Sequence, residues 1–334
     1  MNFKDNVKLS RLFERFELNY RLTHLYSEYL SYFPNSITKN IIDAVRADSD
    51  LTVEEAIIAC LTELFGLSYD RVEDRALIRD YLPRSVKVLD PKRYTEDPYY
   101  KNIKIENKKI GAFELRQESY KPYRGIIADD MKIFPDMSEF ATLGFFEEEF
   151  FFPAVLEDGN EWMTLTPVDL DTCQDAIKRA RGKTVTFGLG LGYYAYMCSE
   201  KPEVETITVI EKSPDVIKLF NEHILPQFSH PEKVIIVNED AFEYAEKTMP
   251  RKNFDFAFVD TWRDASDGLP MYERMKALEG LSPSTEFSYW IEGFILSRKR
   301  SLILSELKSR VEQNGSDIPE SYEEILSLLL LDNL

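Results

Sequence analysis

The stretch TVTFGLGLGYYAYMCSEKPEVETITVIEKSPDVI, residues 184–217, indicates the fold of this chain. A short apolar strand leads into glycines at positions 188, 190 and 192, and a second apolar strand covers residues 205–211. Glycine lets the backbone turn tightly and approach a ligand, and a helix that begins at such a turn directs its free amide groups toward that ligand. The order strand, glycine turn, helix and strand predicts a parallel βαβ unit.

The same alternation continues beyond this unit. Ser213 and Pro214 suit the cap and the first position of a helix, and apolar strands follow over residues 233–240 and 254–260. Residues 287–292 are either a fifth strand or the beginning of a long C-terminal helix. Strands that alternate with helices in this way predict a doubly wound, mainly parallel sheet.

The chain has 334 residues, more than one hydrophobic core usually serves, so we expect more than one folding unit. Residues 1–95 carry apolar side chains at helical spacing and predict a helical N-terminal region. Residues 96–165 hold strand-like runs between Gly, Pro and Asp turns and predict a small β-rich segment. Residues 166–334 are then a Rossmann-like domain with a helical C-terminus, and the predicted fold class is α/β.

The charge is acidic, with 41 Lys and Arg against 59 Asp and Glu and a formal net charge of −18. Such a surface repels phosphate backbones, so we expect a small-molecule substrate and no nucleic-acid partner. The few Cys and His residues form neither a disulfide framework nor a metal-ligand pattern, which predicts no metal and a reducing, cytoplasmic location. No apolar run reaches about 18 residues, so no membrane partner is expected. A homodimer is left open.

One segment combines negative charge with aromatic side chains. Residues 136–161 contain eight acidic residues, six Phe and no Lys or Arg, and they include the run FFEEEFFF. One interpretation is a strand pair with one solvated face. The other is an acidic, aromatic wall that attracts a cationic substrate through charge and cation–π contacts.

Acidic residues follow the second, third and fourth strands. Glu211 comes 19 positions after Gly192, where a carboxylate can bind both ribose hydroxyls of an adenosine, and the alternative is a solvated strand end. Asp240 can accept a hydrogen bond from an adenine amino group beside the backbone of Ala241, or it can cap the helix that follows. Asp260 ends the fourth strand at the edge where open α/β sheets bind ligands, or it is a turn residue. The glycine turn alone fits a methyl donor, a dinucleotide or a purely structural turn.

Four runs together resemble the class I S-adenosylmethionine (SAM)-dependent methyltransferases. They are FGLGLG (187–192), VIEKSPDVI (209–217), NEDAFEY (238–244) and FDFAFVDTW (254–262). The chain is most similar to the branch that includes spermidine synthase, which shares the pattern of Val204-Glu205, Ile207-Thr208 and Val209-Ile210-Glu211. The resemblance covers roughly residues 160–265.

The resemblance implies a Rossmann-like methyltransferase sheet with SAM as the cofactor. The residues expected to bind SAM lie in the turn and at the strand ends: Gly188, Leu189, Gly190, Gly192, Glu211, Lys212, Asp240 and Ala241. We expect Asp260 to act as the catalytic base where the acceptor arrives protonated. The residues expected beside the acceptor are Trp162, Thr164 and Trp262, and core packing is the alternative for the two tryptophans. The acceptor pocket is expected between residues 260–262 and the segment 136–167.

The chain is therefore expected to be an enzyme that transfers the methyl group of SAM to a small or cationic acceptor. Leu191 stands where spermidine synthases carry an acid and no proline follows Asp264, so methyl transfer is favoured over the alternative of aminopropyl transfer. Thr186 stands where many methyltransferases carry an acid, which keeps a non-catalytic SAM-binding protein as another alternative. A nicotinamide-linked oxidoreductase fits the glycine turn but gives Asp240 no role.

Overall fold

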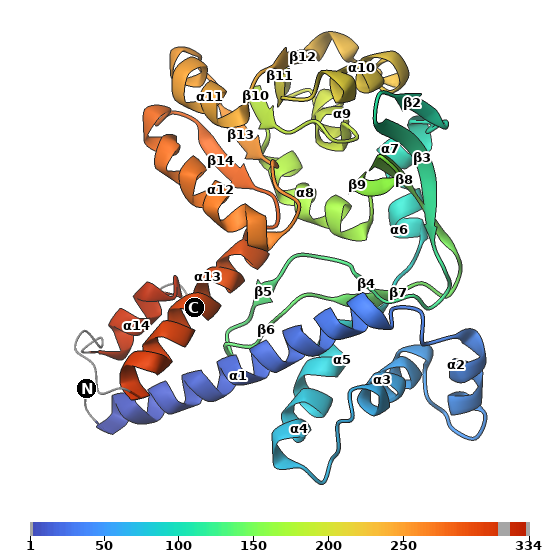
Figure 1. Cartoon of the computed structure of the whole chain (residues 1–334), viewed down its shortest axis with the longest axis vertical. Coiled ribbons are helices and arrows are strands. Elements are labelled where there is room, and N and C mark those ends of the chain that lie inside the picture. The colour runs from blue at the N-terminus through green and yellow to red at the C-terminus, as the bar shows by residue number, and fades with distance from the viewer. Residues whose placement is uncertain (1–2, 313–320, 332–334) are drawn as a thin grey trace. The chain divides into compact units, whose positions relative to one another are not determined.

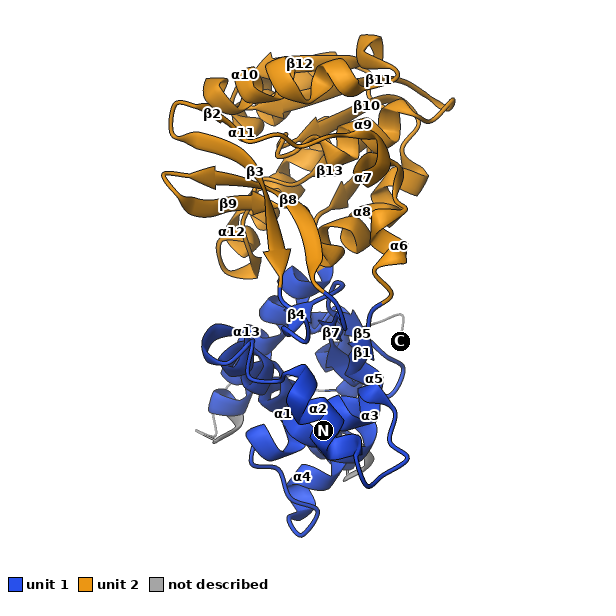
Figure 2. Cartoon of the chain, turned by 90° about the vertical axis from the view of Figure 1, so that its right-hand side faces the viewer, with its two compact units in different colours: residues 1–89, 121–148, 293–334 blue, residues 90–120, 149–292 orange. Residues whose placement is uncertain are grey.

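The computed structural model describes residues 3–312 and 321–331, which form two compact units (Figure 2). Unit 1 contains residues 1–89, 121–148 and 293–334, and unit 2 contains residues 90–120 and 149–292. This division differs from the expected succession of segments 1–95, 96–165 and 166–334. The middle of the chain enters both units, and the helix after the parallel sheet belongs almost entirely to unit 1.

Unit 1 is mainly helical. Its helices are α1 (Phe3–Tyr32), α2 (Lys39–Arg46), α3 (Val53–Leu64), α4 (Val72–Ala76), a π-helical turn (Leu77–Tyr81), α5 (Leu82–Ser85), α13 (Glu292–Glu312) and α14 (Tyr322–Leu328). Helix α3 begins with a capping box: the Glu55 amide donates to the Thr52 hydroxyl, and the Thr52 amide donates to the Glu55 carboxylate. Its buried Ile57 and Leu61 pack in one core with Leu22 and Tyr81.

Short strands bring residues 121–148 into unit 1. Strand β1 (Val86–Val88) pairs in parallel with β7 (Leu143–Phe145), which pairs antiparallel with β4 (Ile126–Ile127), and β5 (Lys132–Ile133) forms a hairpin with β6 (Glu139–Phe140). Phe145 and Phe146 of the acidic run are buried, whereas Glu147, Glu148 and Glu149 are exposed. Because β1 and β7 are far apart in the sequence, only their pairing reveals that this segment joins the N-terminal helices.

Two carboxylates, the half-buried Asp130 and the buried Glu139, attach helix α13 to the same segment. The Asp130 carboxylate accepts hydrogen bonds from the amides of Gly293 (2.8 Å) and Phe294 (3.0 Å), where the helix dipole favours a negative charge. Glu139 forms an ion pair with Arg300, and both side chains are buried. An isolated charge in the protein interior destabilises the fold, so each member of this pair needs the other to remain buried.

Unit 2 contains an antiparallel sheet and a parallel sheet. The antiparallel sheet has the order β2 (Lys108–Ile110), β3 (Phe113–Tyr120), β8 (Phe150–Glu157), β9 (Asn160–Thr164), with the short helices α6 (Lys92–Thr95) and α7 (Pro98–Asn102) before it. Strand β9 lies at its edge and contains a bulge, because Val155 pairs with Met163 while Leu156 pairs with Glu161. Trp162 is the extra residue at this bulge.

The parallel sheet confirms the predicted alternation (Figure 1). Its five strands, in spatial order, are β12 (Val234–Asn238), β11 (Val204–Glu211), β10 (Gly182–Phe187), β13 (Phe256–Val259) and β14 (Glu286–Tyr289). All four neighbouring pairs are parallel, and the order 3-2-1-4-5 is that of a Rossmann-like sheet. Helix α8 (Pro167–Arg179) precedes β10, and the helices between the strands are α9 (Tyr193–Ser199), α10 (Pro214–His223), α11 (Ala241–Glu243, extended by the π-turn Tyr244–Thr248) and α12 (Ala265–Leu278). Residues 287–292 were expected to be either a fifth strand or the beginning of a long helix. Each expectation is confirmed in part, because β14 ends at Tyr289 and α13 begins at Glu292.

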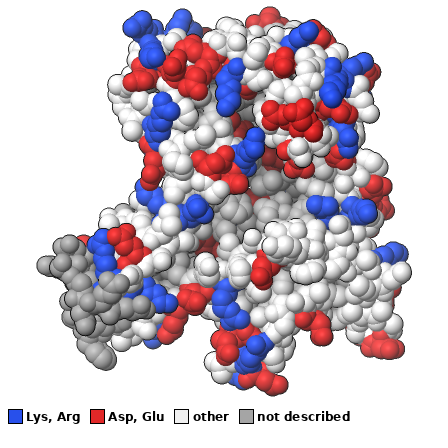
Figure 3. All heavy atoms as spheres, in the orientation of Figure 1, with Lys and Arg blue, Asp and Glu red and all other residues white. Residues whose placement is uncertain are grey.

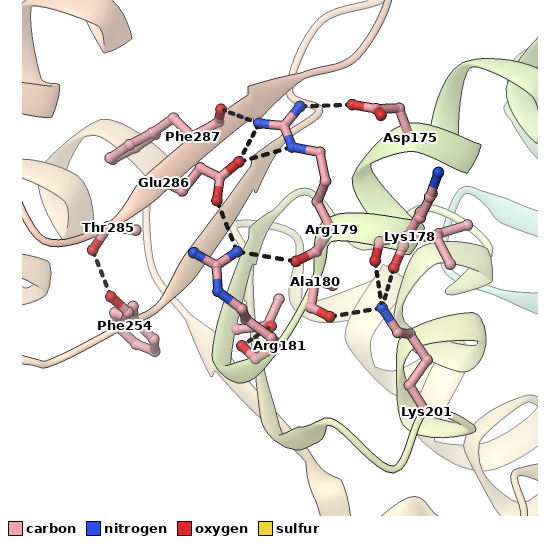
Figure 4. Close-up of polar contacts among 12 residues, drawn as sticks. Asp175, Lys178, Arg179, Ala180, Arg181, Lys201, Phe254, Thr285, Glu286 and Phe287 are labelled. Atoms are coloured by element: carbon pink, nitrogen blue, oxygen red, sulfur yellow. Dashed lines mark hydrogen bonds and ion pairs between the residues drawn. The ribbon is translucent and has the colours of Figure 1, made fainter.

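Ion pairs close the amino edge of this sheet (Figure 4). Arg179 at the end of α8 and Arg181 before β10 both bind Glu286 at the start of β14, at 2.7 Å each. Hydrogen bonds from Arg181 and then Arg179 lower the pKa of Glu286. The Lys201 ammonium donates to three carbonyl groups at the C-terminus of α8. These contacts hold α8, β10 and β14 together at the edge opposite the strand ends that carry Glu211 and Asp260.

No helix formed by the described residues combines the length and apolar character needed to cross a membrane.

The buried pair in unit 1 gives a stability prediction. Arg300→Met leaves the Glu139 carboxylate buried without its cation, and we expect it to lower the free energy of unfolding by about 3–5 kcal/mol in urea denaturation. The double variant Arg300→Met with Glu139→Leu should lose much less than the sum of its single changes. Lys39→Met, which breaks the exposed Lys39–Asp43 pair, is the matched control and should change the free energy of unfolding far less, because solvent screens an exposed pair. Additive costs in the cycle would show that the pair is not coupled.

Candidate functional site

A small cavity lies in unit 2 at the carboxyl ends of β10 and β13. Its volume is about 20 Å³, close to the space that one water molecule needs. Its wall includes residues from four parts of the unit: Met163 and Leu165 from the β9 region, Asp169 and Cys173 from α8, Thr186, Gly188 and Leu189 from β10 and its turn, and Asp260 after β13. The predicted glycine turn and the predicted catalytic acid therefore face one cavity.

The glycine turn, residues 188–192, passes against the backbone that follows β13. Gly188 has φ +100°, and a Cβ at this position would lie 1.9 Å from the Asp260 carbonyl oxygen. Gly190 has φ +51°, and its Cβ would lie 2.1 Å from the sulfur of Met163. Only glycine fits at 188, because the atom it meets is backbone and cannot move away. Gly192 precedes α9 and packs against the Phe220 ring.

The Glu211 carboxylate lies directly under this turn. It is buried, and it accepts hydrogen bonds from the amides of Leu189 (3.2 Å) and Ser213 (2.7 Å). Each carboxylate oxygen has a second lone pair, so Glu211 can also accept from a ligand hydroxyl. The side chain is thus part of the turn rather than a solvated strand end. Its neighbour Lys212 is exposed.

Asp260 is the most perturbed acid of the site. Burial raises its pKa to about 8, and repulsion from Asp169 and Glu211 adds to the effect. Burial also raises the pKa of Asp169 to about 6, even though Asp169 accepts hydrogen bonds from the amide and hydroxyl of Thr166 at 2.8 Å each. Among the described residues, none donates a hydrogen bond to the Asp260 side chain. A half-buried carboxylate without a hydrogen-bond donor among the described residues is suited to receive a proton or a cation.

The two buried thiols near this region are not nucleophiles. Burial raises the pKa of Cys173 well above its usual value and that of Cys198 to about 12, so both remain protonated at neutral pH. Both are free cysteines. Within residues 3–312 and 321–331, no group of three His, Cys, Asp or Glu side chains is arranged to hold a metal ion.

Asp240 caps helix α11, as one of its two interpretations expects. Its carboxylate accepts from the amides of Phe242 (2.9 Å) and Glu243 (3.1 Å), and the side chain is exposed. Asp240 and Ala241 follow β12, next to the strand that ends in Glu211. Both amides donate to Oδ1, so Oδ2 of the same carboxylate can still accept a hydrogen bond from a ligand. An adenine contact therefore stays a prediction.

The three residues expected beside the acceptor do not form the wall of the cavity. Trp162 packs edge-to-face on Phe113, with ring centroids 5.3 Å apart. Trp262 is buried, stacks on Tyr289 and donates its indole N–H to the Trp290 carbonyl. Thr164 pairs with Ala154 in the antiparallel sheet. Their packing roles are therefore visible, and their contact with an acceptor stays a prediction.

Sequence reasoning missed two residues that the structure brings to Asp260. Asp169 could have been noticed, because Thr166-Pro167 followed by an acid at the third helical position is the pattern of a helix start. Met163 had no such signal, since it reaches the turn through a bulge that a strand pattern does not reveal. From the segment 136–167, residues Met163 and Leu165 reach the cavity.

Comparisons with known proteins give a limited result. No family model matches the chain, and no curated protein sequence matches it. Among solved structures, it is similar to precorrin-8W decarboxylase from Methanobacterium thermoautotrophicum, with 13% identity over 42% of this chain and 67% of that chain, at a TM-score of 0.27. It is also similar to spermidine synthase from Thermotoga maritima, with 18% identity over 56% of this chain, at a TM-score of 0.29. The chain spans 62% of the length of that spermidine synthase.

The raised pKa of Asp260 predicts a pH-dependent stability. Between about pH 4 and pH 8 the folded protein holds this proton while the unfolded chain loses it, so stability should fall with rising pH by up to about 1.4 kcal/mol per unit. Above about pH 8 this contribution should become constant. Asp260→Asn cannot ionise, so its advantage over the wild type should grow from pH 5 to pH 8 in urea denaturation.

Asp158→Asn is the matched control, because Asp158 is an exposed turn residue of the same unit at φ +49°, which asparagine tolerates. Its difference from the wild type should stay flat over the same pH range. A flat difference for Asp260→Asn as well would mean that Asp260 ionises normally in the folded protein.

Proposed function

We propose that unit 2 is a SAM-dependent methyltransferase that acts on a small, cationic acceptor. The observation that supports this proposal most directly is that the half-buried Asp260, whose pKa is raised, lines one cavity with the glycine turn at the end of a parallel sheet. Ligands of open α/β sheets bind at this edge. The substrate is then a small molecule, and neither nucleic acid nor a membrane is required as a partner.

The side chains at the strand ends fit an adenosine-containing cofactor. Glu211 has free acceptor capacity beside the turn for ribose hydroxyls, and Asp240 with Ala241 would hold the adenine at the next strand end. Gly188 and Leu189 would lie along the donor, and Lys212 at its outer side. The negative charge of Asp169 would attract the positively charged groups of SAM. A ligand of this size needs several hundred Å³, so a side chain in the present wall has to move on binding.

SAM supplies a methyl group that is activated by its bond to a sulfonium. The chain's own task is to align the acceptor with this group and to exclude water. The pKa of about 8 keeps Asp260 largely protonated in the free protein at neutral pH, so the positive charge of the bound cofactor has to lower this pKa before Asp260 accepts the proton of an ammonium acceptor and frees the lone pair that attacks. Asp169 stays close enough to raise the proton affinity of Asp260. Once a cation is bound, its charge would favour the ionised form of both acids.

Aminopropyl transfer from decarboxylated SAM is the second candidate, and the same acids favour it. A donor without a carboxylate avoids repulsion from Asp169 and Asp260, and Thr186 in the wall adds no charge. Leu191 remains the residue that favours methyl transfer. In both cases a small substrate suits unit 2 better than a polyanion does. Lys and Arg side chains are interspersed with Asp and Glu over its visible surface (Figure 3, upper part), so they do not gather into one basic face there. A homodimer is compatible with either candidate.

Calorimetric titration with SAM, decarboxylated SAM and NAD tests the donor directly. We expect binding of one of the two adenosyl donors and none of NAD. Glu211→Gln retains one acceptor oxygen for the backbone but removes the charge. It should weaken the binding of the adenosyl donor by about 1.5–3 kcal/mol. Glu205→Gln, an exposed acid on the same strand, is the matched control and should bind as the wild type does. Equal affinity in Glu211→Gln and the wild type would remove Glu211 from the site.

The nucleoside product distinguishes the two candidate reactions. Incubation with each donor and a panel of primary and secondary amines should yield S-adenosylhomocysteine for methyl transfer and methylthioadenosine for aminopropyl transfer, both identified by mass spectrometry. Asp260→Asn should lower turnover by about 10²–10⁴-fold, as expected for loss of a general base, while donor affinity changes little. Unchanged turnover would mean that alignment alone accounts for the rate.

A further inference from the structure

A side chain of the protein itself fills the glycine turn. The sulfur of Met163 lies 3.1 Å from the Leu191 nitrogen, whose N–H points to it as a donor. The same sulfur lies 2.1 Å from the position that a Cβ of Gly190 would take. The thioether therefore occupies the space that the absence of a side chain at Gly190 creates.

The fold aims Met163 at this place through an irregular strand. Trp162 is the extra residue of the bulge in β9, and a bulge turns the neighbouring side chains away from their regular direction. Among the described strands, β9 pairs with β8 alone, so it lies at the edge of its sheet. One ladder of hydrogen bonds holds it, so Met163 can be displaced without opening the centre of a sheet.

The size of the cavity shows what Met163 controls. The cavity measures about 20 Å³, whereas pockets for ligands of adenosine size measure about 300 Å³ or more. The other wall residues close to the turn are less able to yield, because Gly188 contacts the backbone of Asp260 and Leu189 is fixed to Glu211. Methionine is unbranched and flexible, and it adapts to different surroundings at low cost.

We propose that Met163 is a displaceable plug of the donor site, and that its side chain must leave the glycine turn before an adenosyl ligand binds there. This inference rests on the proposed function and adds a residue that sets donor affinity. A site that is open for only a fraction of the time binds with an affinity reduced by that fraction. Shortening the plug should therefore tighten binding, whereas removal of an ordinary packing or ligand-contacting residue would weaken it.

Calorimetry with S-adenosylhomocysteine compares the wild type with Met163→Ala. The variant should bind at least ten times more tightly, a change of about 1.4 kcal/mol. Met271→Ala is the matched control: Met271 is a half-buried methionine of α12 that does not line the cavity, and its replacement should leave affinity unchanged. Binding by Met163→Ala alone, with none by the wild type, would also support the plug.

A second measurement on the wild type does not depend on the folding of a variant. With methyl-¹³C methionine, the Met163 resonance is identified by its absence in Met163→Leu, and it should move to a solvent-exposed shift when S-adenosylhomocysteine is added. If the wild type binds but its Met163 resonance stays in place, or if Met163→Ala binds no more tightly, the plug is wrong and donor binding stands. If neither the wild type nor Met163→Ala binds S-adenosylhomocysteine, the proposed function is wrong, and the inference about Met163 is wrong as well.

Discussion

The hydrogen bonds that continue strand β10 past its end hold the candidate site together. The Gly188 amide donates to the Ile210 carbonyl, and the Asp260 amide donates to the Phe187 carbonyl, both at 2.9 Å. The turn is therefore attached to the end of β11 on one side and to the end of β13 on the other. Because a Cβ at position 188 would collide with the Asp260 carbonyl, this arrangement requires glycine there. Glu211 and Asp260 come to the same place as a direct result of parallel pairing.

The gathering of three acidic side chains is the main chemical property of this place. Asp169, Glu211 and Asp260 come from a helix and two strands, and the carboxylate repulsion between them is part of what raises the pKa of Asp260. Backbone amides compensate Glu211, and Thr166 compensates Asp169, but Asp260 has no such donor among the described residues. A carboxyl group without a donor keeps its proton near neutral pH, and a cation bound beside it would favour the ionised form.

The two edges of the parallel sheet serve different purposes. At the amino edge, arginines on both sides of one glutamate bind α8, β10 and β14 into a fixed frame. At the carboxyl edge, backbone turns replace these ion pairs, and a flexible methionine fills the remaining space. A rigid frame beneath adaptable turns is the common arrangement for binding sites of α/β proteins, since the frame positions the turns without obstructing them.

The sequence by itself determined the strands, the glycine turn and the helix starts, because each depends on residues that are near neighbours in the chain. The apolar runs 205–211, 233–240 and 254–260 all became parallel strands, and Ser213 became a helix cap. It also predicted that Asp260 would lie at the carboxyl edge. Only the tertiary structure placed Asp169 and Met163 beside Asp260, and only it assigned residues 121–148 to the helical unit. These features depend on a bulge and on pairings between distant segments, which leave no periodic pattern in the sequence.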